Sequence, residues 1–534
     1  MSNQDIQATW QYHDGTKHPA GRLMNPQHHF DPSRQPLLFK IYKDLPSISL
    51  PLDPSPSVPA LEAIAGEIPA AGGESAPDLP AVARLLYFSA GITKYFQYPP
   101  PWGRIPFRAA ACTGALYHIE LYLVCGDLPD PSTLSPSGVS PLPSVGDFAG
   151  QGLEAGVYHF DPQALALRRL RRGNYRQALI AASAHEPGVA RAPATFVLTD
   201  VVWRNAVKYQ AREYRHAFWD SGTILANTLA VAAAQRLPAR VVLGFVDAEV
   251  SRLLDLDPER ELALALVPIG SAPNSTVPPA PSVTPLHLEI EPYSRRELDF
   301  PAIRAMHTAS SLSDADAVAA WRSALPHLTR PAPTGPLTPL QPFAEDELPS
   351  EPIEKVIVRR GSTREFAREA ISFRQLSTAL DRALRGLNAD FLESPEALLN
   401  DAYLIVNAVD GLAPGAYVYR RDRQALELLK AGNFRATAGH LALHQDLAAD
   451  ASVAIFFLAD LPPILAGLGN RGYRAAQLDA SLAAGRLYLA AYALGFGATG
   501  LTFFDDAATE FFSPHAQGKS AMFLIALGKK RQRP

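Results

Sequence analysis

Two groups that can move protons lie side by side in the segment Val201–Phe218, VVWRNAVKYQAREYRHAF. They are Lys208 and Tyr209, and Arg212 and Arg215 follow them closely along the chain. Lysine and tyrosine act as general bases or acids when their surroundings bring the side-chain pKa toward the working pH. Neighbouring arginines would lower the proton affinity of a partly buried lysine, and they would also attract an anion. The segment therefore predicts acid–base chemistry beside an anionic cofactor, against the plainer interpretation of a solvated helix face.

A second cluster of charged residues lies in VRRGSTREF, just before a stretch with helical spacing, ISFRQLSTALDRAL. Guanidinium groups bind phosphate oxygens two at a time, and a helix start favours the same anions. The cluster therefore predicts a phosphate clamp, which Lys529 from the C-terminal LGKKRQRP could also reach. Its members are Arg359, Arg360, Ser362 and Arg364. A solvated basic surface is the alternative for this cluster taken alone.

A glycine turn, CTGALYHIELYLV, leads into a strand-like segment at Cys112–Val124. Because glycine has no Cβ, Thr113 and Gly114 can bring backbone N–H groups close to a planar ligand. We align this segment with Ser394–Val406, SPEALLNDAYLIV, in which Pro-Glu replaces Thr-Gly. The second version is less suited to a close approach of the backbone.

The second half of the chain repeats the first at a constant separation of 259 residues. The matched pieces are Gly156-Val157-Tyr158 with Gly415-Ala416-Tyr417, Gly173-Asn174-Tyr175-Arg176 with Gly432-Asn433-Phe434-Arg435, Tyr214-Arg215 with Tyr473-Arg474, and Phe245-Val246-Asp247 with Phe504-Asp505-Asp506. One shared offset indicates a fused duplicate whose copies pack as an internal pseudo-dimer, with two unpaired copies as the alternative. The recurring aspartates are expected to cap helices, and no metal site is predicted.

The chemistry is divided unequally between the two copies. At the place that matches the arginine clamp, the first copy has GEIPAAGGESAPDLP, which carries only acidic charge. In the second copy, Gly467-Leu468 stands where the first has Lys208-Tyr209. Phosphate binding is therefore predicted in the second copy, and ring and proton chemistry in the first. One site at the interface between the copies follows, together with one degenerate site.

Composition narrows the class of protein. The 534 residues carry a net charge of −4 with a pI near 6.4, so electrostatics gives no case for nucleic acid or a membrane surface. Two cysteines, a polar N-terminal stretch and the lack of long apolar runs favour a cytoplasmic protein. Proline-rich stretches suggest an arm (1–60), a first domain (61–270), a linker (271–350) and a second domain (351–534).

Together, these motifs resemble the flavin-dependent nitroreductase-like dehydrogenases of the SagB/ThcOx type, over roughly residues 80–530. The family's RRSxR motif resembles Arg359–Arg364, and its PSxGALYPxExY motif resembles Cys112–Tyr122. Its catalytic Lys-Tyr pair resembles Lys208-Tyr209, and its segment that passes the flavin ring resembles Gly500–Phe503. Three positions depart from the pattern, because Cys112, Thr113 and His118 stand where Pro, Ser and Pro are usual.

The resemblance implies an α+β fold, with two nitroreductase-like domains whose antiparallel sheets are wrapped by helices, and a non-covalent FMN. It implies that Lys208 and Tyr209 are catalytic. The cofactor-binding residues expected from the resemblance and the clamp together are Thr113, Gly114, Ala115, Leu116, Arg215, Arg359, Arg360, Ser362, Arg364, Gly500, Leu501, Thr502 and Lys529.

The resulting hypothesis is an FMN-dependent dehydrogenase that oxidises a thiazoline or oxazoline in a peptide-like natural product, free or held by a carrier. A substrate hydride goes to the flavin, Lys208 or Tyr209 takes the proton, and oxygen reoxidises the flavin. Two alternatives stay open: an NAD(P)H-dependent reductase of the nitroreductase type, and a flavin-free protein that binds substrate for a partner enzyme. The chain is expected to be a monomer or a dimer of pseudo-dimers, without nucleic-acid or membrane partners.

Overall fold

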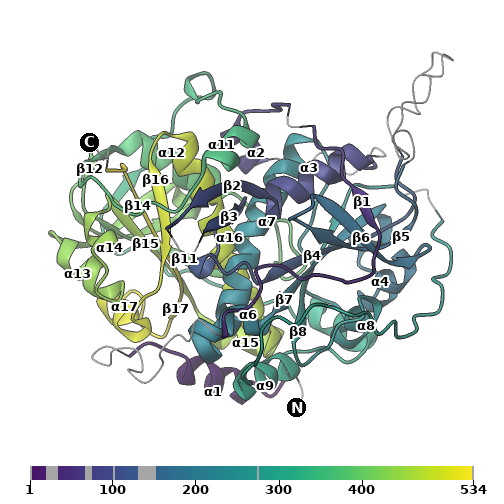
Figure 1. Ribbon diagram of the computed structural model, residues 1–534. Coiled ribbons are helices and arrows are strands. Elements are labelled where there is room, and N and C mark those ends of the chain that lie inside the picture. Colours follow the sequence, from purple (N-terminus) through teal and green to yellow (C-terminus); the bar gives the residue numbers. More distant parts are fainter. Residues whose placement is uncertain are drawn as a thin grey trace.

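The computed structural model describes residues 3–19, 34–53, 55–66, 75–99, 103–129, 152–272 and 276–531. Within these ranges the chain forms two α+β halves, each an antiparallel sheet with helices packed on it (Figure 1). Two long helices, one from each half, lie side by side between the sheets. The fold class predicted from the sequence is therefore confirmed. The sequence matched the acidic segment 66–80 with the arginine clamp of the second copy. Residues 67–74 of that segment lie outside the described residues.

The elements follow the duplicated order. In the first half they are α2 (Ala60–Ala65), α3 (Leu79–Ala90), β2 (Ile92–Gln97), β3 (Arg104–Arg108), β4 (Ile119–Cys125), β5 (Gly156–Asp161), β6 (Ala166–Arg172), α4 (Arg176–Ala182), α5 (Pro187–Arg191), β7 (Ala194–Val201), α6 (Val202–Tyr209), α7 (Glu213–Ala234), α8 (Asp247–Leu253) and β8 (Glu261–Ile269). In the second half they are α11 (Ile353–Arg359), β10 (Ile371–Ser372), α12 (Phe373–Ala383), β11 (Asn400–Val406), β12 (Val409–Asp410), β13 (Gly415–Arg420), β14 (Ala425–Ala431), α13 (Arg435–Leu441), α14 (Asp446–Asp450), β15 (Val453–Ala459), α15 (Leu461–Leu468), α16 (Arg471–Ala493), β16 (Gly497–Leu501), α17 (Asp505–Phe512) and β17 (Ser520–Gly528).

The two main sheets share one strand order. The first runs β1-β6-β5-β4-β7-β8, and the second runs β16-β17-β15-β11-β13-β14-β9, with all neighbours antiparallel. Apart from the extra β16, the second order is the first read from the opposite edge. Corresponding strands also share a bulge, before Tyr158 in β5 and before Tyr417 in β13. The repeat in the sequence is therefore a repeat of the fold.

The arm and the linker each contribute an edge strand. Strand β1 (Ser47–Ser49) pairs with β6, and β9 (Leu337–Pro339) pairs with β14 at the corresponding residues. The arm also contains α1 (Gln7–Gly15), and the linker contains α9 (Pro301–Ala309) and α10 (Ala315–Ser323). The prolines of the linker obscured these helices, although start signals were present, because Pro301 opens α9 and the Asp314 carboxylate accepts a hydrogen bond from the Ala317 backbone N–H.

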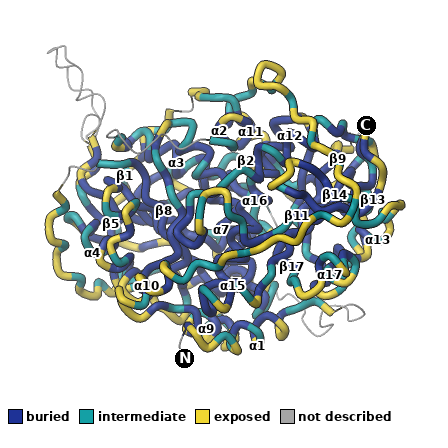
Figure 2. Tube along the Cα trace, turned by 180° about the vertical axis from the view of Figure 1, so that it is seen from behind, coloured by how far each residue is buried: buried dark blue, intermediate teal, exposed yellow. Residues whose placement is uncertain are grey.

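Helices α7 and α16 form the centre of the molecule and are buried along most of their lengths (Figure 2). They cross where small residues let the backbones approach. A Cβ built on Gly222 would lie 1.8 Å from Ser481 Oγ and 2.7 Å from the Leu482 backbone nitrogen. A Cβ on Gly485 would lie 2.7 Å from the Ala226 Cβ. Since Gly222 and Ser481 are themselves 259 residues apart, the two copies meet at equivalent positions.

Two reciprocal ion-pair clusters join the halves beside this crossing. The Asp247 carboxylate, from the first half, lies 2.7 Å from an Arg471 nitrogen and 2.8 Å from an Arg474 nitrogen. The Asp505 carboxylate, from the second half, accepts hydrogen bonds from Arg215 at 2.6 Å and from Arg212 at 3.1 Å. The prediction that these aspartates cap helices is wrong for their side chains, because the arginines engage both carboxylates.

Substitution of Gly222 tests the helix crossing. Gly222→Ala should lower the free energy of unfolding by about 1–3 kcal/mol, because backbone atoms of the opposite helix would have to shift. Adding Ser481→Gly should restore part of the loss, since it removes the closest atom. Gly15→Ala is the control, because no atom lies within 4 Å of the added Cβ. Wild-type stability of Gly222→Ala in urea unfolding would contradict the packing described here.

Acid titration tests the ion pairs. Burial alone would raise the pKa of Asp247, but Arg471 and Arg474 lower it to about 2. A carboxyl group with a depressed folded-state pKa stabilises the fold above its unfolded pKa, about 3.9, and loses that contribution as the pH falls through the folded value. The difference in unfolding free energy between wild type and Asp247→Asn should therefore shrink between pH 5 and pH 2. Asp44→Asn, at an exposed residue, is the control, and a pH-independent difference for Asp247→Asn would contradict the pairing.

Candidate functional site

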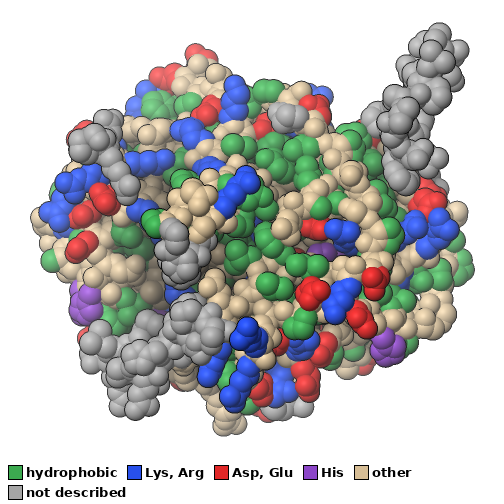
Figure 3. Space-filling model, viewed as in Figure 1, with side chains coloured by type: hydrophobic (Ala, Val, Ile, Leu, Met, Phe, Trp, Pro, Cys, Tyr) green, Lys and Arg blue, Asp and Glu red, His purple; other side chains and the backbone are tan. Residues whose placement is uncertain are grey.

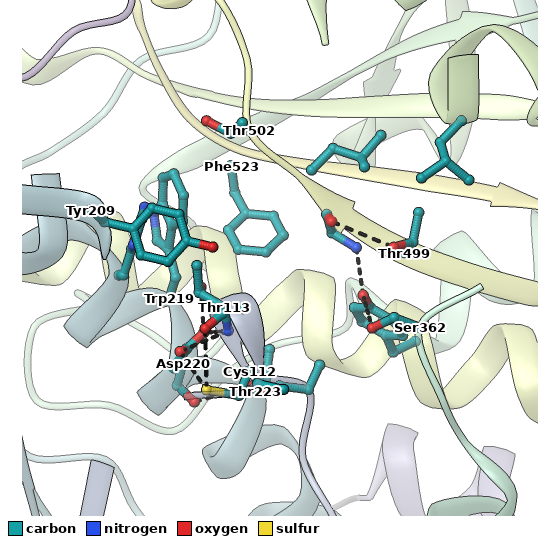
Figure 4. Close-up of a pocket in the computed structure, with 18 of the residues that line it drawn as sticks. Cys112, Thr113, Tyr209, Trp219, Asp220, Thr223, Ser362, Thr499, Thr502 and Phe523 are labelled. Atoms are coloured by element: carbon teal, nitrogen blue, oxygen red, sulfur yellow. Dashed lines mark hydrogen bonds between the residues drawn. The ribbon is translucent and has the colours of Figure 1, made fainter. Parts of the chain in front are cut away.

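A pocket of about 280 Å³ opens between the two halves (Figure 4). The first half lines it with Ala111, Cys112, Thr113, Gly114, Ala115, Lys208, Tyr209, His216, Trp219, Asp220 and Thr223. The second half lines it with Ser362, Arg364, Gln445, Leu447, Tyr488, Thr499, Gly500, Leu501, Thr502 and Phe523. We call this the interface pocket. Ten of the predicted site residues meet there: Lys208, Tyr209, Thr113, Gly114, Ala115, Ser362, Arg364, Gly500, Leu501 and Thr502.

The end of helix α6 brings Lys208 and Tyr209 into the pocket. The helix stops at Tyr209 because Gln210 adopts a φ of 51°, and the chain then turns into α7. Lys208 Nζ lies 5.2 Å from the centre of the Tyr209 ring, and the Tyr209 hydroxyl points into the cavity in Figure 4. The two proton-transfer groups are therefore adjacent in space as well as in sequence.

The pocket shifts the two pKa values in opposite directions. Partial burial, and then the positive charge of Arg364, lower the pKa of Lys208. Burial, and then the negative charge of Asp220, raise the pKa of Tyr209. The predicted cause of the lysine shift is corrected here: the cation that acts on Lys208 is Arg364 from the second half, whereas Arg212 and Arg215 are bound to Asp505.

A loop with unusual backbone angles forms the first-half wall. It comprises residues 112–117 and includes a short 3₁₀ turn, Thr113–Ala115. Gly114, Ala115 and Tyr117 have φ values of 64°, 55° and 48°. A Cβ on Gly114 would lie 2.9 Å from the Tyr209 hydroxyl oxygen. Gly114 therefore serves both the left-handed turn and the close approach of Lys208 and Tyr209.

Strand β16 and the residue after it form the facing wall. The Thr502 hydroxyl is buried at the pocket and has no hydrogen-bond partner among the described residues. The Gly500 backbone N–H donates to the Tyr488 hydroxyl, which lies 3.3 Å from the Ser362 hydroxyl. Arg364 makes no ion pair with a described residue, so its charge is free to meet an anion. A group with polar edges and a negative charge fits these donors.

Five predicted cofactor-binding residues do not line the pocket. Arg359 pairs with Glu351, and Lys529 lies 3.5 Å from Glu369. The buried Arg360 guanidinium donates to the Ala109 carbonyl at 2.8 Å. Arg215 is held by Asp505, and Leu116 is packed in the interior. The single clamp predicted from Arg359, Arg360, Ser362, Arg364 and Lys529 is therefore divided, and only Ser362 and Arg364 face the pocket.

Sequence reasoning missed several pocket residues, which are His216, Trp219, Asp220, Tyr488 and Phe523. One of them left a signal. Asp220 and Asp479 lie 259 residues apart within the two central helices, and a buried acid that recurs in both copies is unusual. The aromatic residues gave no comparable signal, because aromatic residues inside a long apolar helix or a strand are most often core.

Within the described part of the chain, the first half has no open wall like the one that β16 forms in the second half, because other residues bind the corresponding backbone. At offset 259, Gly500 and Thr502 correspond to Val241 and Leu243. The Val241 backbone N–H donates to the Asn388 carbonyl, and the Asp390 carboxylate accepts from the Leu243 N–H at 2.8 Å.

The strand register corrects the alignment of the glycine turn, because it pairs Ile119 with Asp200 and Asn400 with Ala459. Our predicted alignment of the glycine turn is therefore wrong by one residue, and Gly114 corresponds to Pro395.

On the face in Figure 3, basic and acidic side chains are interspersed. Among the described helices, none combines the length and apolar character needed to cross a bilayer.

Both the sequence and the fold match known proteins. A family model described as the nitroreductase family matches residues 157–271 and 357–529. A crystal structure of a protein assigned as a nitroreductase from Anabaena variabilis aligns with a TM-score of 0.73 at 25% identity, covering 98% of this chain and 99% of that chain.

Two other solved structures align over about half of this chain. A protein assigned as a nitroreductase from Ralstonia eutropha gives a TM-score of 0.30 at 15% identity, covering 48% of this chain and 99% of that chain. The E. coli microcin synthetase McbBCD complex with truncated pro-MccB17 bound gives 0.28 at 17% identity, covering 51% of this chain and 95% of that chain. No curated protein matches the sequence significantly.

The family match supports the cofactor predicted from the sequence, since FMN is the cofactor on which nitroreductase family members depend. The match lies in both copies and covers more than half of the residues, so the chain belongs to the nitroreductase family.

Proposed function

We propose that this chain is an FMN-dependent dehydrogenase that binds one FMN in the interface pocket and oxidises an azoline ring, a thiazoline or oxazoline, in a peptide-like natural product. The observation that carries the proposal is the meeting of Lys208 and Tyr209 with Arg364 and the Gly114 loop around one cavity. If the Lys-Tyr pair were only part of a solvated helix face, we would not expect it to face Arg364 and the loop around Gly114, which come from two distant parts of the chain.

The residues present suit FMN. Its phosphate matches Arg364, and its polar ring edge matches the unpartnered Thr502 hydroxyl and the backbone groups beside Gly114 and Gly500. When bound, FMN supplies the hydride acceptor. The protein contributes the pocket walls, the positive charge and the proton-transfer groups.

Lys208 is the better candidate for the base. Its lowered pKa enlarges the fraction that is neutral near physiological pH, and only a neutral amine can take a proton. The raised pKa of Tyr209 keeps that hydroxyl protonated, so it can donate a hydrogen bond to the substrate or to the amine. We assign proton removal to Lys208 and orientation to Tyr209. The choice of an azoline rests on the resemblance of these motifs to the SagB/ThcOx type.

Flavin stoichiometry tests the single site. The purified chain, reconstituted with FMN, should bind about one FMN per chain, because the corresponding second place is filled by Asn388 and Asp390. Arg364→Gln should weaken FMN binding about tenfold through the loss of a charge-assisted contact. Arg359→Gln is the matched control from the same cluster, since Arg359 pairs with Glu351. Two flavins per chain, or equal losses in both variants, would contradict this assignment.

The pH dependence of azoline oxidation tests the base. With FMN saturating and a synthetic thiazoline as substrate, azole formation measured by mass spectrometry should rise with pH and level off below the ordinary lysine pKa of about 10.4. Lys208→Ala should abolish this rise, and Arg364→Gln should move it to higher pH, because removing a neighbouring cation raises the pKa of Lys208. Full activity of Lys208→Ala would refute the mechanism. Absence of azole together with rapid flavin bleaching by NADPH would favour the reductase instead.

A further inference from the structure

A buried cluster of ionisable groups lies directly beneath the wall of the interface pocket. His118 is fully buried, and its Nδ1 lies 2.7 Å from an Asp200 oxygen and 3.3 Å from a Glu213 oxygen. Its Nε2 lies 2.8 Å from the Asp220 Oδ2. Both ring nitrogens therefore face carboxyl groups, and an imidazole can donate from both nitrogens only when it is protonated.

The charges of the cluster support a protonated histidine. Burial alone would lower the pKa of His118, but Asp200, Asp220 and Glu213 raise it well above its ordinary value. Burial, and then the charge of Asp200, raise the pKa of Glu213 well above its ordinary value. The cluster therefore favours an imidazolium at His118, held between the side chains of Asp200 and Asp220, and the raised pKa of Glu213 favours its neutral form.

Asp220 connects this cluster to the strained loop of the pocket. Its carboxylate accepts hydrogen bonds from the Thr113 backbone N–H at 2.9 Å, the Thr113 hydroxyl at 2.8 Å and the Cys112 thiol at 3.0 Å. Cys112 Sγ in turn accepts from the Tyr117 backbone N–H at 3.0 Å. The carboxylate thus restrains the start of the left-handed stretch directly and its end through Cys112.

Loop residues with positive φ keep that conformation only when their surroundings fix it. The Asp220 contacts supply that constraint, and His118 anchors Asp220 from outside the loop, because the other hydrogen bonds to this carboxylate come from the loop itself. His118 itself touches no part of the pocket surface. The hydrogen bonds that lead from His118 to the pocket therefore run through Asp220 and the loop.

We propose that His118 is a positioning residue of the flavin site, which acts through Asp220 to hold loop 112–117 in the conformation that receives the ring. The inference rests on the proposed FMN site and extends it to a residue outside the pocket. It gives a role to a histidine at a position where the resembling family usually has proline.

FMN binding to the apoprotein, followed by flavin fluorescence, tests the proposal. His118→Gln should raise the FMN dissociation constant about tenfold. The control is His159→Gln, which breaks another buried pair, His159 Nε2 with Glu120 at 3.1 Å, on residues that do not line the pocket. It should lower thermal stability but leave the FMN dissociation constant within about twofold of wild type.

A double-mutant cycle separates transmission from a general loss of structure. If His118 acts through Asp220, the pair His118→Gln and Asp220→Asn should bind FMN no more weakly than Asp220→Asn alone. Additive losses, an unchanged dissociation constant in His118→Gln, or an equal loss in His159→Gln would overturn the inference while leaving the proposed function intact. A wild-type apoprotein that does not bind FMN would instead refute the proposed function.

Thiol accessibility gives a readout that needs no flavin. In the apoprotein, Cys112 is held by Asp220 and by the Tyr117 N–H, and Cys125 is fully buried. His118→Gln should increase the rate at which one thiol reacts with a thiol reagent, and Cys112→Ser in the same background should remove that increase. A reaction rate equal to that of wild type in folded His118→Gln would show that the loop does not depend on His118.

Discussion

The structure depends on the close contact of α7 and α16, where the two copies meet through small residues. Helices approach this closely only where side chains are missing, and Gly222 and Gly485 provide the gaps. The Asp247 and Asp505 ion pairs then fix the relative rotation of the halves, since each carboxylate reaches two arginines at or just before the start of the opposite central helix. Buried charges of this kind are costly when one partner is lost, about 3–5 kcal/mol, so the clusters favour one alignment strongly.

That alignment creates the chemistry of the pocket. The pocket takes the Lys-Tyr pair from the first half and Arg364 from the second. Arg364 acts on Lys208 only because the second copy is placed against the first. The electrostatic field at the amine is therefore a property of the interface, and the sequence near Lys208 does not contain it.

Much of the fold could be predicted from the sequence. The constant offset identified a duplicate, and β5 with β13 and β8 with β17 begin at the offset it gives. The motif at Thr113–Gly114 and the Lys208–Tyr209 pair were brought to one cavity with Ser362, Arg364 and Gly500. These positions were predictable because they belong to the motifs on which the family resemblance rested.

The arginines show where such reasoning ends. An arginine in a motif can bind a phosphate, a carboxylate or a carbonyl, and only the tertiary structure decides which is closest. Arg215 meets Asp505, Arg359 meets Glu351, and Arg360 meets a carbonyl of Ala109. The linker helices α9 and α10 were missed for a related reason. Proline is common at the first position of a helix as well as in loops, so a proline-rich stretch does not by itself indicate a loop.

Because the two copies are fused in one chain, the pocket does not depend on protein concentration for its assembly. In a protein built from two separate subunits, a shared cavity exists only while the subunits stay associated, so its occupancy falls with protein concentration. Here one polypeptide carries both walls, and each wall is always in the neighbourhood of the other at a high effective concentration. The cavity between Gly114 and Gly500 is thus assembled by an intramolecular step, and its integrity is independent of how many copies of the chain are present.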